Sequence, residues 1–128
     1  MANIASFTSP PGGSDGFGPG QTPEFLDAQT TTTPGFSQTL ITRVVGATET
    51  LFLRYVVVTT TKGGCFEIRD NASVIGSGRT GASQTNASFL YPVAREIASG
   101  NTLTVVFEQP AGAGSASDIE AYVMGYTT

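Results

Sequence analysis

The chain has 128 residues, with ten acidic and six basic side chains and a net charge of −4 at neutral pH. This length suits one domain. The six basic residues are scattered, so nucleic-acid binding through phosphates is not expected. The chain has no His and one Cys, which excludes an internal disulfide and zinc sites made of Cys or of Cys and His. Because His is also the commonest general base, we expect no enzyme, no catalytic residue, no metal and no other cofactor.

The N-terminal residues 1–7 contain no positive side chain and no apolar run, so they do not resemble a secretory signal. The longest apolar stretch, residues 51–58, is interrupted by Arg54 and is too short to span a membrane. We therefore expect synthesis in the cytoplasm and no contact with a membrane.

Residues 1–37 differ in composition from the remainder, since 11 of these 37 positions are Gly or Pro. This density disfavours a helix or a long strand, and we predict an extended N-terminal arm. Its apolar side chains either cover one end of the protein's own core or bind a neighbouring subunit or partner. These candidate anchors are Ile4, Phe7, Phe17, Phe25 and Leu26.

Residues 38–128 show the alternation typical of β-strands. In chain order, strands are predicted at 39–45, 50–61, 65–69, 74–75, 88–91, 102–108 and 119–126, with 93–97 a short strand or irregular segment. Pro92 is expected to end its strand, and residues 76–87 and 110–117 are expected to be loops. Seven or eight strands without an amphipathic helix predict an all-β domain, an antiparallel sandwich or barrel of jelly-roll or immunoglobulin type.

The last strand has two different faces. Ile119 and Val123 are expected to point inward, whereas Tyr122, Met124 and Tyr126 share the opposite face. This second face is either a shallow aromatic platform or an oligomer interface, and the soft apolar side chain of Met124 favours the interface. The predicted core is Leu103, Val105, Phe107, Ile119, Val123, Phe66, Ile68, Phe52 and Val56.

Three patterns could indicate chemistry. Residues 76–81 fit G-x-G-x-x-G, but no helix is expected to follow, as a dinucleotide site requires, so we interpret them as a loop. The carboxylates, Asp118 and Glu120 among them, are interpreted as solvated; a calcium site formed by Asp70, Asn71 and Asp118 is the less favoured alternative. Cys65 is expected to be a small buried hydrophobic residue rather than a nucleophile.

A Pro-led segment, a Gly turn and a strand occupy residues 91–105, and a small-residue loop then leads to a closing strand, residues 119–126, that contains Gly-Tyr. This arrangement is similar to the jelly-roll modules of tailed-phage virion structural proteins, in particular capsid decoration (cement) proteins. The resemblance implies a homotrimer on the outer capsid surface that binds the major capsid protein and stabilises the lattice.

The alternative function is a receptor- or glycan-binding β-sandwich module of a phage tail or head fibre. Trimeric fibres usually have a long stalk, and this chain contains no segment of that kind, which favours the decoration protein.

Overall fold

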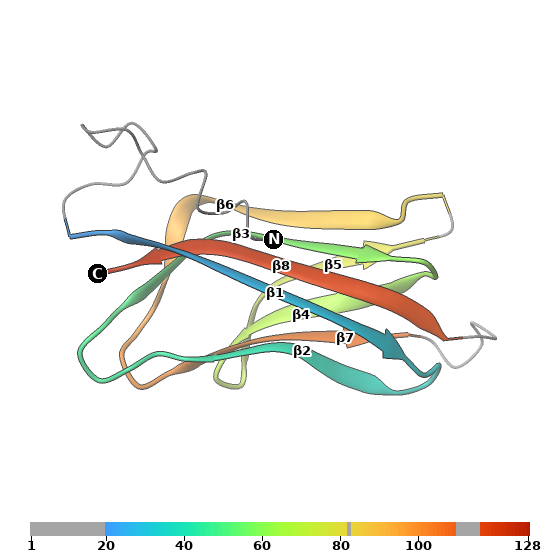
Figure 1. The fold of residues 1–128 in the computed structure, drawn as a ribbon, viewed down its shortest axis with the longest axis horizontal. Coiled ribbons are helices and arrows are strands. Elements are labelled where there is room, and N and C mark those ends of the chain that lie inside the picture. The colour runs from blue at the N-terminus through green and yellow to red at the C-terminus, as the bar shows by residue number, and fades with distance from the viewer. Residues whose placement is uncertain (1–19, 82, 110–115) are drawn as a thin grey trace.

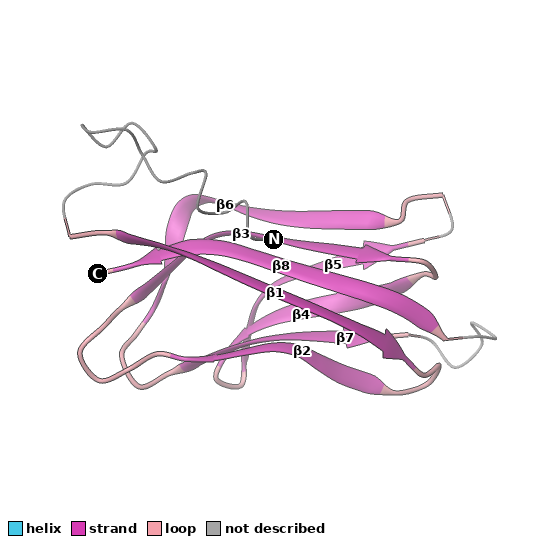
Figure 2. Ribbon diagram, viewed as in Figure 1, coloured by secondary structure: helices cyan, strands magenta, loops and turns pink. Residues whose placement is uncertain are grey.

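The computed structural model describes residues 20–81, 83–109 and 116–128. In these residues the chain forms eight strands and no helix (Figure 2), so the predicted all-β fold is confirmed. Among them there is accordingly no helix long and apolar enough to cross a membrane. The strands are β1 (Thr22–Thr32), β2 (Ser37–Val44), β3 (Leu51–Thr60), β4 (Gly64–Asp70), β5 (Ser73–Thr80), β6 (Asn86–Ile97), β7 (Thr102–Glu108) and β8 (Ser117–Thr127).

The strands form two antiparallel sheets packed as a sandwich (Figure 1). Sheet A has the order β1-β8-β3-β6, and sheet B has the order β2-β7-β4-β5. The first strand pairs with the eighth, the second with the seventh, the third with the sixth and the fourth with the fifth. The chain is therefore a long antiparallel hairpin rolled into two layers, which is a jelly roll. Each sheet has one face toward the core and one face outward.

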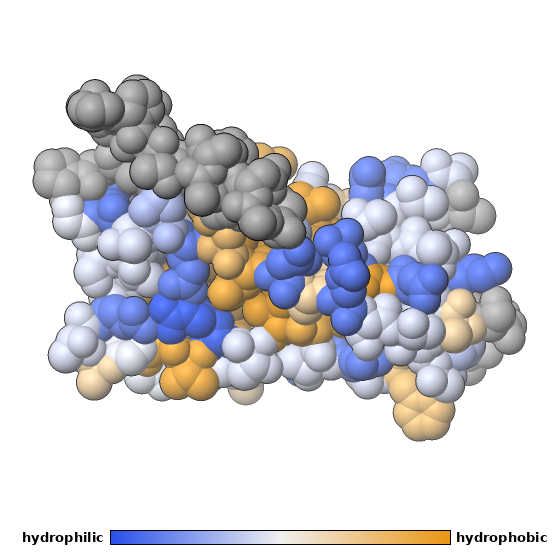
Figure 3. Space-filling view, viewed as in Figure 1, coloured by the Kyte–Doolittle hydropathy of each residue, from blue (hydrophilic) through white to orange (hydrophobic). Residues whose placement is uncertain are grey.

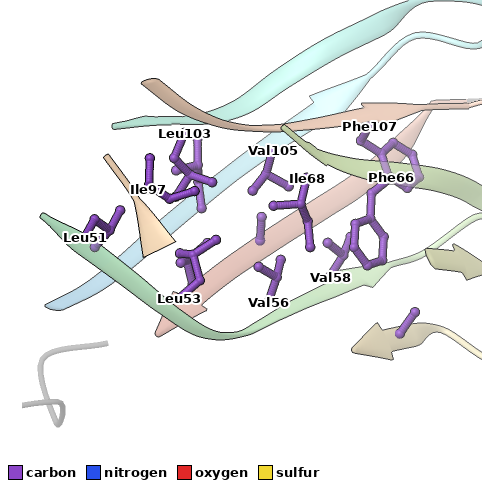
Figure 4. Close-up of a cluster of buried hydrophobic side chains, with 14 of the residues drawn as sticks. Leu51, Leu53, Val56, Val58, Phe66, Ile68, Ile97, Leu103, Val105 and Phe107 are labelled. Carbon is purple, nitrogen blue, oxygen red and sulfur yellow. The ribbon is translucent and has the colours of Figure 1, made fainter. Parts of the chain in front are cut away.

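The core lies between the two sheets (Figure 4). Phe66 and Phe107 are its largest side chains, and both are fully buried. Eight of the nine predicted core residues are buried. Strands β2 and β6, for which the sequence predicts no core residue, also contribute to the core. They add Ile41, Ala87 and Ile97.

Strand β3 changes phase at Arg54, where its pairing with β6 and with β8 shifts register. Such a bulge reverses which parity of residues faces the core. The prediction that Phe52 shares the core with Val56 is therefore wrong, and Phe52 lies half-buried on the outer face of sheet A. The β3 residues that face the core are Leu51, Leu53, Val56 and Val58.

The structure corrects the predicted end of the N-terminal arm, which we placed at residue 37. Residues 22–32 form β1, and β1 pairs with β8 along its entire length. Leu26 and Ala28 point inward from β1 and pack against the core. The sandwich therefore begins at β1, and the arm prediction is confined to residues 1–19, which lie outside the described residues.

Strand β5 corrects the predicted loop at 76–87, because the G-x-G part of the glycine motif belongs to the strand and pairs with β4. A Cβ at Gly78 would overlap the ring of Phe66. Strand β6 likewise continues through Pro92, which does not end it, to Ile97. Pro92 is accommodated because residues 91–94 lie opposite the single residue Arg54, where the ladder is already interrupted.

One ion-pair cluster ties the two sheets together along the β1–β2 edge. The Arg43 guanidinium on β2 donates to both carboxylate oxygens of Glu24 on β1, one of them at 2.8 Å, and to Glu49 at 2.8 Å. Glu49 also accepts a hydrogen bond from the backbone N–H of Gly46 at 2.9 Å. The two acidic partners raise the pKa of Arg43 above its ordinary value.

Candidate partner-binding surface

The outer face of sheet A carries the residues predicted to form an oligomer interface. Along β8, buried and partly exposed residues alternate, so Tyr122, Met124 and Tyr126 share the outward face as expected. Their location is confirmed, whereas their role as an interface stays a prediction.

Neighbouring strands extend this face with further apolar side chains. In an antiparallel ladder, directly paired residues project from the same face of the sheet. Met124 is paired with Phe25 on one side and with Tyr55 on the other. We call the resulting cluster the hydrophobic patch. It consists of Phe25, Phe52, Tyr55, Val57, Tyr122, Met124 and Tyr126.

Ring contacts connect the members of the hydrophobic patch. Phe52 and Tyr126 are stacked, with ring centroids 5.0 Å apart and planes inclined by 16°. Tyr122 lies between Tyr55 at 6.4 Å and Phe25 at 6.5 Å. Such aromatic pairs add about 0.5–1.5 kcal/mol beyond their buried area, so the patch is pre-arranged rather than a set of independent side chains.

Figure 3 shows hydrophobic side chains gathered over the middle of the face that β1 and β8 present, with hydrophilic side chains on either side. All eight strands belong to the two sheets, so no third layer of described residues covers this face. Apolar surface of this kind, bordered by polar groups, often marks a site of interaction with another protein.

One border of the hydrophobic patch is acidic. Asp27 and Glu120 lie close to each other, and partial burial, followed by the neighbouring Glu120 carboxyl, raises the pKa of Asp27. Burial also raises the pKa of Tyr122, with smaller effects of Tyr55 and Asp27. A partner that approaches this border with a Lys or Arg would meet negative charge.

Beyond the acidic border, sheet A is lined by threonine side chains. A shallow hollow of about 480 Å³ lies there, between the ends of β1, β3 and β8. Gln29 donates to Glu120 at 3.2 Å, and Thr31 donates to Asp118 at 2.9 Å. The outer face of sheet A is thus apolar in its middle and polar at this end.

The outer face of sheet B has a different character. A hollow of about 560 Å³ lies over β4, β5 and β7 and is lined by two arginines and two glutamates as well as Cys65. Arg69 pairs with Glu67 at 2.5 Å. Cys65 is a free thiol that is only partly buried, so the expectation of a buried Cys65 is wrong. This charged face resembles an ordinary solvated surface.

The five predicted arm anchors separate into three groups. Phe25 points outward from β1 into the hydrophobic patch, whereas Leu26 points inward and packs against the core. The position of Leu26 therefore agrees with the alternative in which the apolar side chains of the arm cover the protein's own core. Ile4, Phe7 and Phe17 lie outside the described residues.

The sequence alone did not identify Phe52, Tyr55 and Val57 as members of this surface. Their alternation with buried residues on β3 is the only local signal, and the bulge at Arg54 interrupts it. Pairing of β3 with β8 brings these three residues beside the predicted tyrosines. The local sequence pattern does not indicate this long-range register.

The alternative calcium site is not assembled. Asp70 ends β4 and accepts a hydrogen bond from Asn101 at 2.9 Å, whereas Asp118 lies beside Thr61, before β4 begins. The length of β4 separates the two carboxylates. Among the described residues, no three His, Cys, Asp or Glu side chains are grouped to hold a metal ion.

A scan against protein-family models finds no match, and a search of curated proteins finds none either. Among solved structures, a chain of the cyanophage Pam1 capsid asymmetric unit is similar, with a TM-score of 0.58 and 14% identity over 87% of this chain and 89% of that chain. The coat protein of Tobacco streak virus has a TM-score of 0.50 and 8% identity over 84% and 86% of the two chains. The fold of this protein is thus shared with viral capsid and coat proteins.

A third solved structure, the periplasmic g-type lysozyme inhibitor PliG of Aeromonas hydrophila, covers 86% of this chain and 90% of its own. Its TM-score is 0.41 and its identity 12%, and a likeness at that level carries no functional argument.

Proposed function

We propose that this protein is a non-enzymatic virion structural protein that binds the outer surface of a capsid as a decoration, or cement, protein. The observation that carries the proposal is the similarity of its jelly roll to a chain of the Pam1 capsid asymmetric unit over nearly the full length of both chains. The coat protein of Tobacco streak virus supports the same class of role.

The hydrophobic patch supports a role in assembly. We propose that Tyr122, Met124 and Tyr126 contact neighbouring copies in a homotrimer that assembles on the particle. Aromatic and Met side chains are enriched in the centres of protein interfaces, and here they occupy the middle of a sheet face that no third layer of described residues covers. Among the described strands, β1 and β6 lie at the edges of sheet A and each pair on one side only, and assembly is one way to protect such edges.

The proposed partner on the particle is the major capsid protein, with attachment through the N-terminal residues Ile4, Phe7 and Phe17. Each apolar anchor could contribute about 1.5–3 kcal/mol before the cost of ordering the segment. Three such segments on one trimer would bind together far more tightly than one alone. The trimer, the capsid partner and the outer location form one proposal and are tested together.

The test is incorporation into virus particles. Gradient-purified particles should contain the protein in fixed stoichiometry with the major capsid protein, and antibodies should label intact particles from outside. Met124→Glu should lower incorporation, whereas Val106→Glu, on the outer face of sheet B, should not. Particles that contain no copies of the protein, or only copies shielded from antibody, would contradict the decoration role.

A glycan-binding module is the second candidate function. The observation in its favour is the threonine-lined hollow on sheet A, whose lining residue Glu120 is two positions before Tyr122 on β8, and Tyr122 in turn contacts Tyr55. Retention of the protein on a glycan column, with loss of retention in Tyr122→Ala and no incorporation into particles, would favour this function over the decoration role.

A further inference from the structure

The hydrophobic patch lacks a cover from the described residues, and residues 1–19 precede the strand that borders it. Strand β1 begins where Thr22 pairs with Thr127, and the next residue, Pro23, pairs with Tyr126. Tyr126 stacks on Phe52. The N-terminal segment is therefore covalently attached at one margin of the patch.

The point of attachment favours a reversal of the chain. Gly20 has φ = 76°, a left-handed conformation that suits glycine. In the sequence Gly20 follows Pro19, and Pro followed by a left-handed Gly is typical of a type II turn. A turn of this type reverses the chain direction, which would allow the preceding residues to return toward the sheet.

The composition of the segment suits an apolar surface. Residues 1–19 contain Ile4, Phe7 and Phe17, and Asp15 is their one charged side chain. The segment can therefore lie on the patch without burying several charges, whose desolvation would be costly. Its proline residues reduce the entropy lost when the segment becomes ordered.

The dimensions of the segment and of the patch agree. Four strands at about 4.8 Å spacing make sheet A about 14 Å wide, and three rows of outward residues extend about 14–20 Å along the strands. The 12 residues between Ile4 and Phe17 give these two positions a root-mean-square separation of about 20 Å if the chain is flexible. Both ends of the segment can thus reach one patch.

We propose that, in the free protein, residues 2–19 bind the hydrophobic patch of the same molecule. A tethered segment has an effective concentration in the millimolar range, which exceeds the concentration of a second copy in most solutions. The proposal concerns the free protein and does not depend on the capsid role. In that role, one contact keeps both the patch and the anchors occupied until a particle competes for them.

The test compares the full chain with a chain that lacks residues 2–19. The full chain should be monomeric by light scattering and should bind little of the hydrophobic dye ANS. The truncated chain should bind several-fold more dye and should self-associate. A synthetic peptide of residues 2–19, added to the truncated chain, should reverse both effects, whereas a peptide with Phe7→Ser and Phe17→Ser should not.

Two variants of the truncated chain identify the surface to which the peptide binds. In the truncated chain, Met124→Glu should abolish peptide binding, and Val106→Glu, on the outer face of sheet B, should leave it unchanged. Circular dichroism confirms that each variant is folded. If truncation prevents folding, a full-length double variant takes the place of the truncated chain. This variant carries Phe7→Ser and Phe17→Ser, and it should give the same rise in dye binding.

Two results would overturn the proposal. In the first, removal of the segment changes neither dye binding nor mass, and the peptide does not bind. In the second, the full chain is an oligomer that dissociates when residues 2–19 are removed, which would assign the segment to a second copy. Neither result bears on whether the protein is found on particles.

Discussion

Thr60 on β3 donates a buried hydrogen bond of 2.9 Å to the hydroxyl of Thr80 on β5. The bond joins sheet A to sheet B, because β3 and β5 belong to different sheets. Thr80 in turn donates to the backbone carbonyl of Gly64 at 3.4 Å. The pair satisfies two buried hydroxyl groups at the end of the sandwich where apolar side chains give way to polar ones.

Thr80→Val should lower the free energy of unfolding by about 1–3 kcal/mol, because it leaves the buried Thr60 hydroxyl without its acceptor. The double variant Thr60→Val, Thr80→Val should cost less than the sum of the two single variants, since neither hydroxyl is then stranded. Urea unfolding measures all three, and Thr59→Val, exposed on the same strand, is the control. Strict additivity would show that the bond does not link the two residues energetically.

Gly125→Ala should destabilise the protein, by about 1–3 kcal/mol as for other overpacked sites. A Cβ at Gly125 would overlap the backbone carbonyl oxygen of Phe52 on the neighbouring strand. Gly81→Ala is the matched control, because no atom beyond its two chain neighbours lies within 4 Å of a Cβ built there. Thermal unfolding should separate the two variants, and equal melting temperatures would contradict the close approach of β3 and β8.

Leu53→Ala should cost about 2–5 kcal/mol, as expected for a fully buried leucine. Phe52→Ala, one residue earlier, should cost about 1 kcal/mol, because it mainly removes a surface ring pair with Tyr126. The greater loss for Leu53→Ala is unexpected, because Phe has the larger side chain. It follows from the bulge at Arg54, which leaves Leu53 in the core and Phe52 on the outer face. Chemical denaturation of both variants measures it, and a greater loss for Phe52→Ala would place Phe52 in the core after all.

The bulge also shows how far the sequence predicts this fold. On β7 and β8 the core-facing residues recur at every second position, so the inward faces and the positions of Tyr122, Met124 and Tyr126 are predicted correctly. On β3 the same rule fails at Arg54, because the insertion of one residue is visible only in the pairing with β6 and β8. Local alternation cannot reveal where the core-facing positions change from odd to even residue numbers.

Strand β1 and most of strand β5 were not predicted, for different reasons. In β5 the inward positions carry Gly76 and Gly78, because side chains from other strands fill the space; a Cβ at Gly78 would overlap the Phe66 ring. In β1 the edge position tolerates Pro23 near the start of the strand, and the run Thr30–Thr32 adds no apolar alternation. Both strands are held by their partners rather than by their own apolar pattern.

Lowering the pH should weaken the ion-pair cluster at the β1–β2 edge, because it protonates Glu49. The hydrogen bond from Arg43, followed by that from the Gly46 N–H, holds the pKa of Glu49 below its ordinary value of 4.5. Because the folded-state pKa is lowered, this stabilisation is present above pH 4.5 and is lost as the pH falls through the folded-state pKa. Urea unfolding from pH 7 downward should show a smaller decline for Glu49→Gln than for the unmodified protein. Parallel curves would contradict the assignment.

Alkaline conditions should weaken the contact between β6 and β5 through Tyr91. Its hydroxyl donates to the carbonyl of Ile75 at 3.2 Å, and burial raises its pKa from 10.0 to about 12, although Arg95 opposes the shift. Since the folded-state pKa is the higher one, the stabilisation is complete below pH 10 and is lost as the pH rises through about 12. The free energy of unfolding should therefore fall more steeply between these values for the unmodified protein than for Tyr91→Phe. The other tyrosines are the same in both proteins, so the difference between the two curves reports Tyr91 alone, and identical slopes would show that Tyr91 ionises equally easily in the folded and unfolded chains.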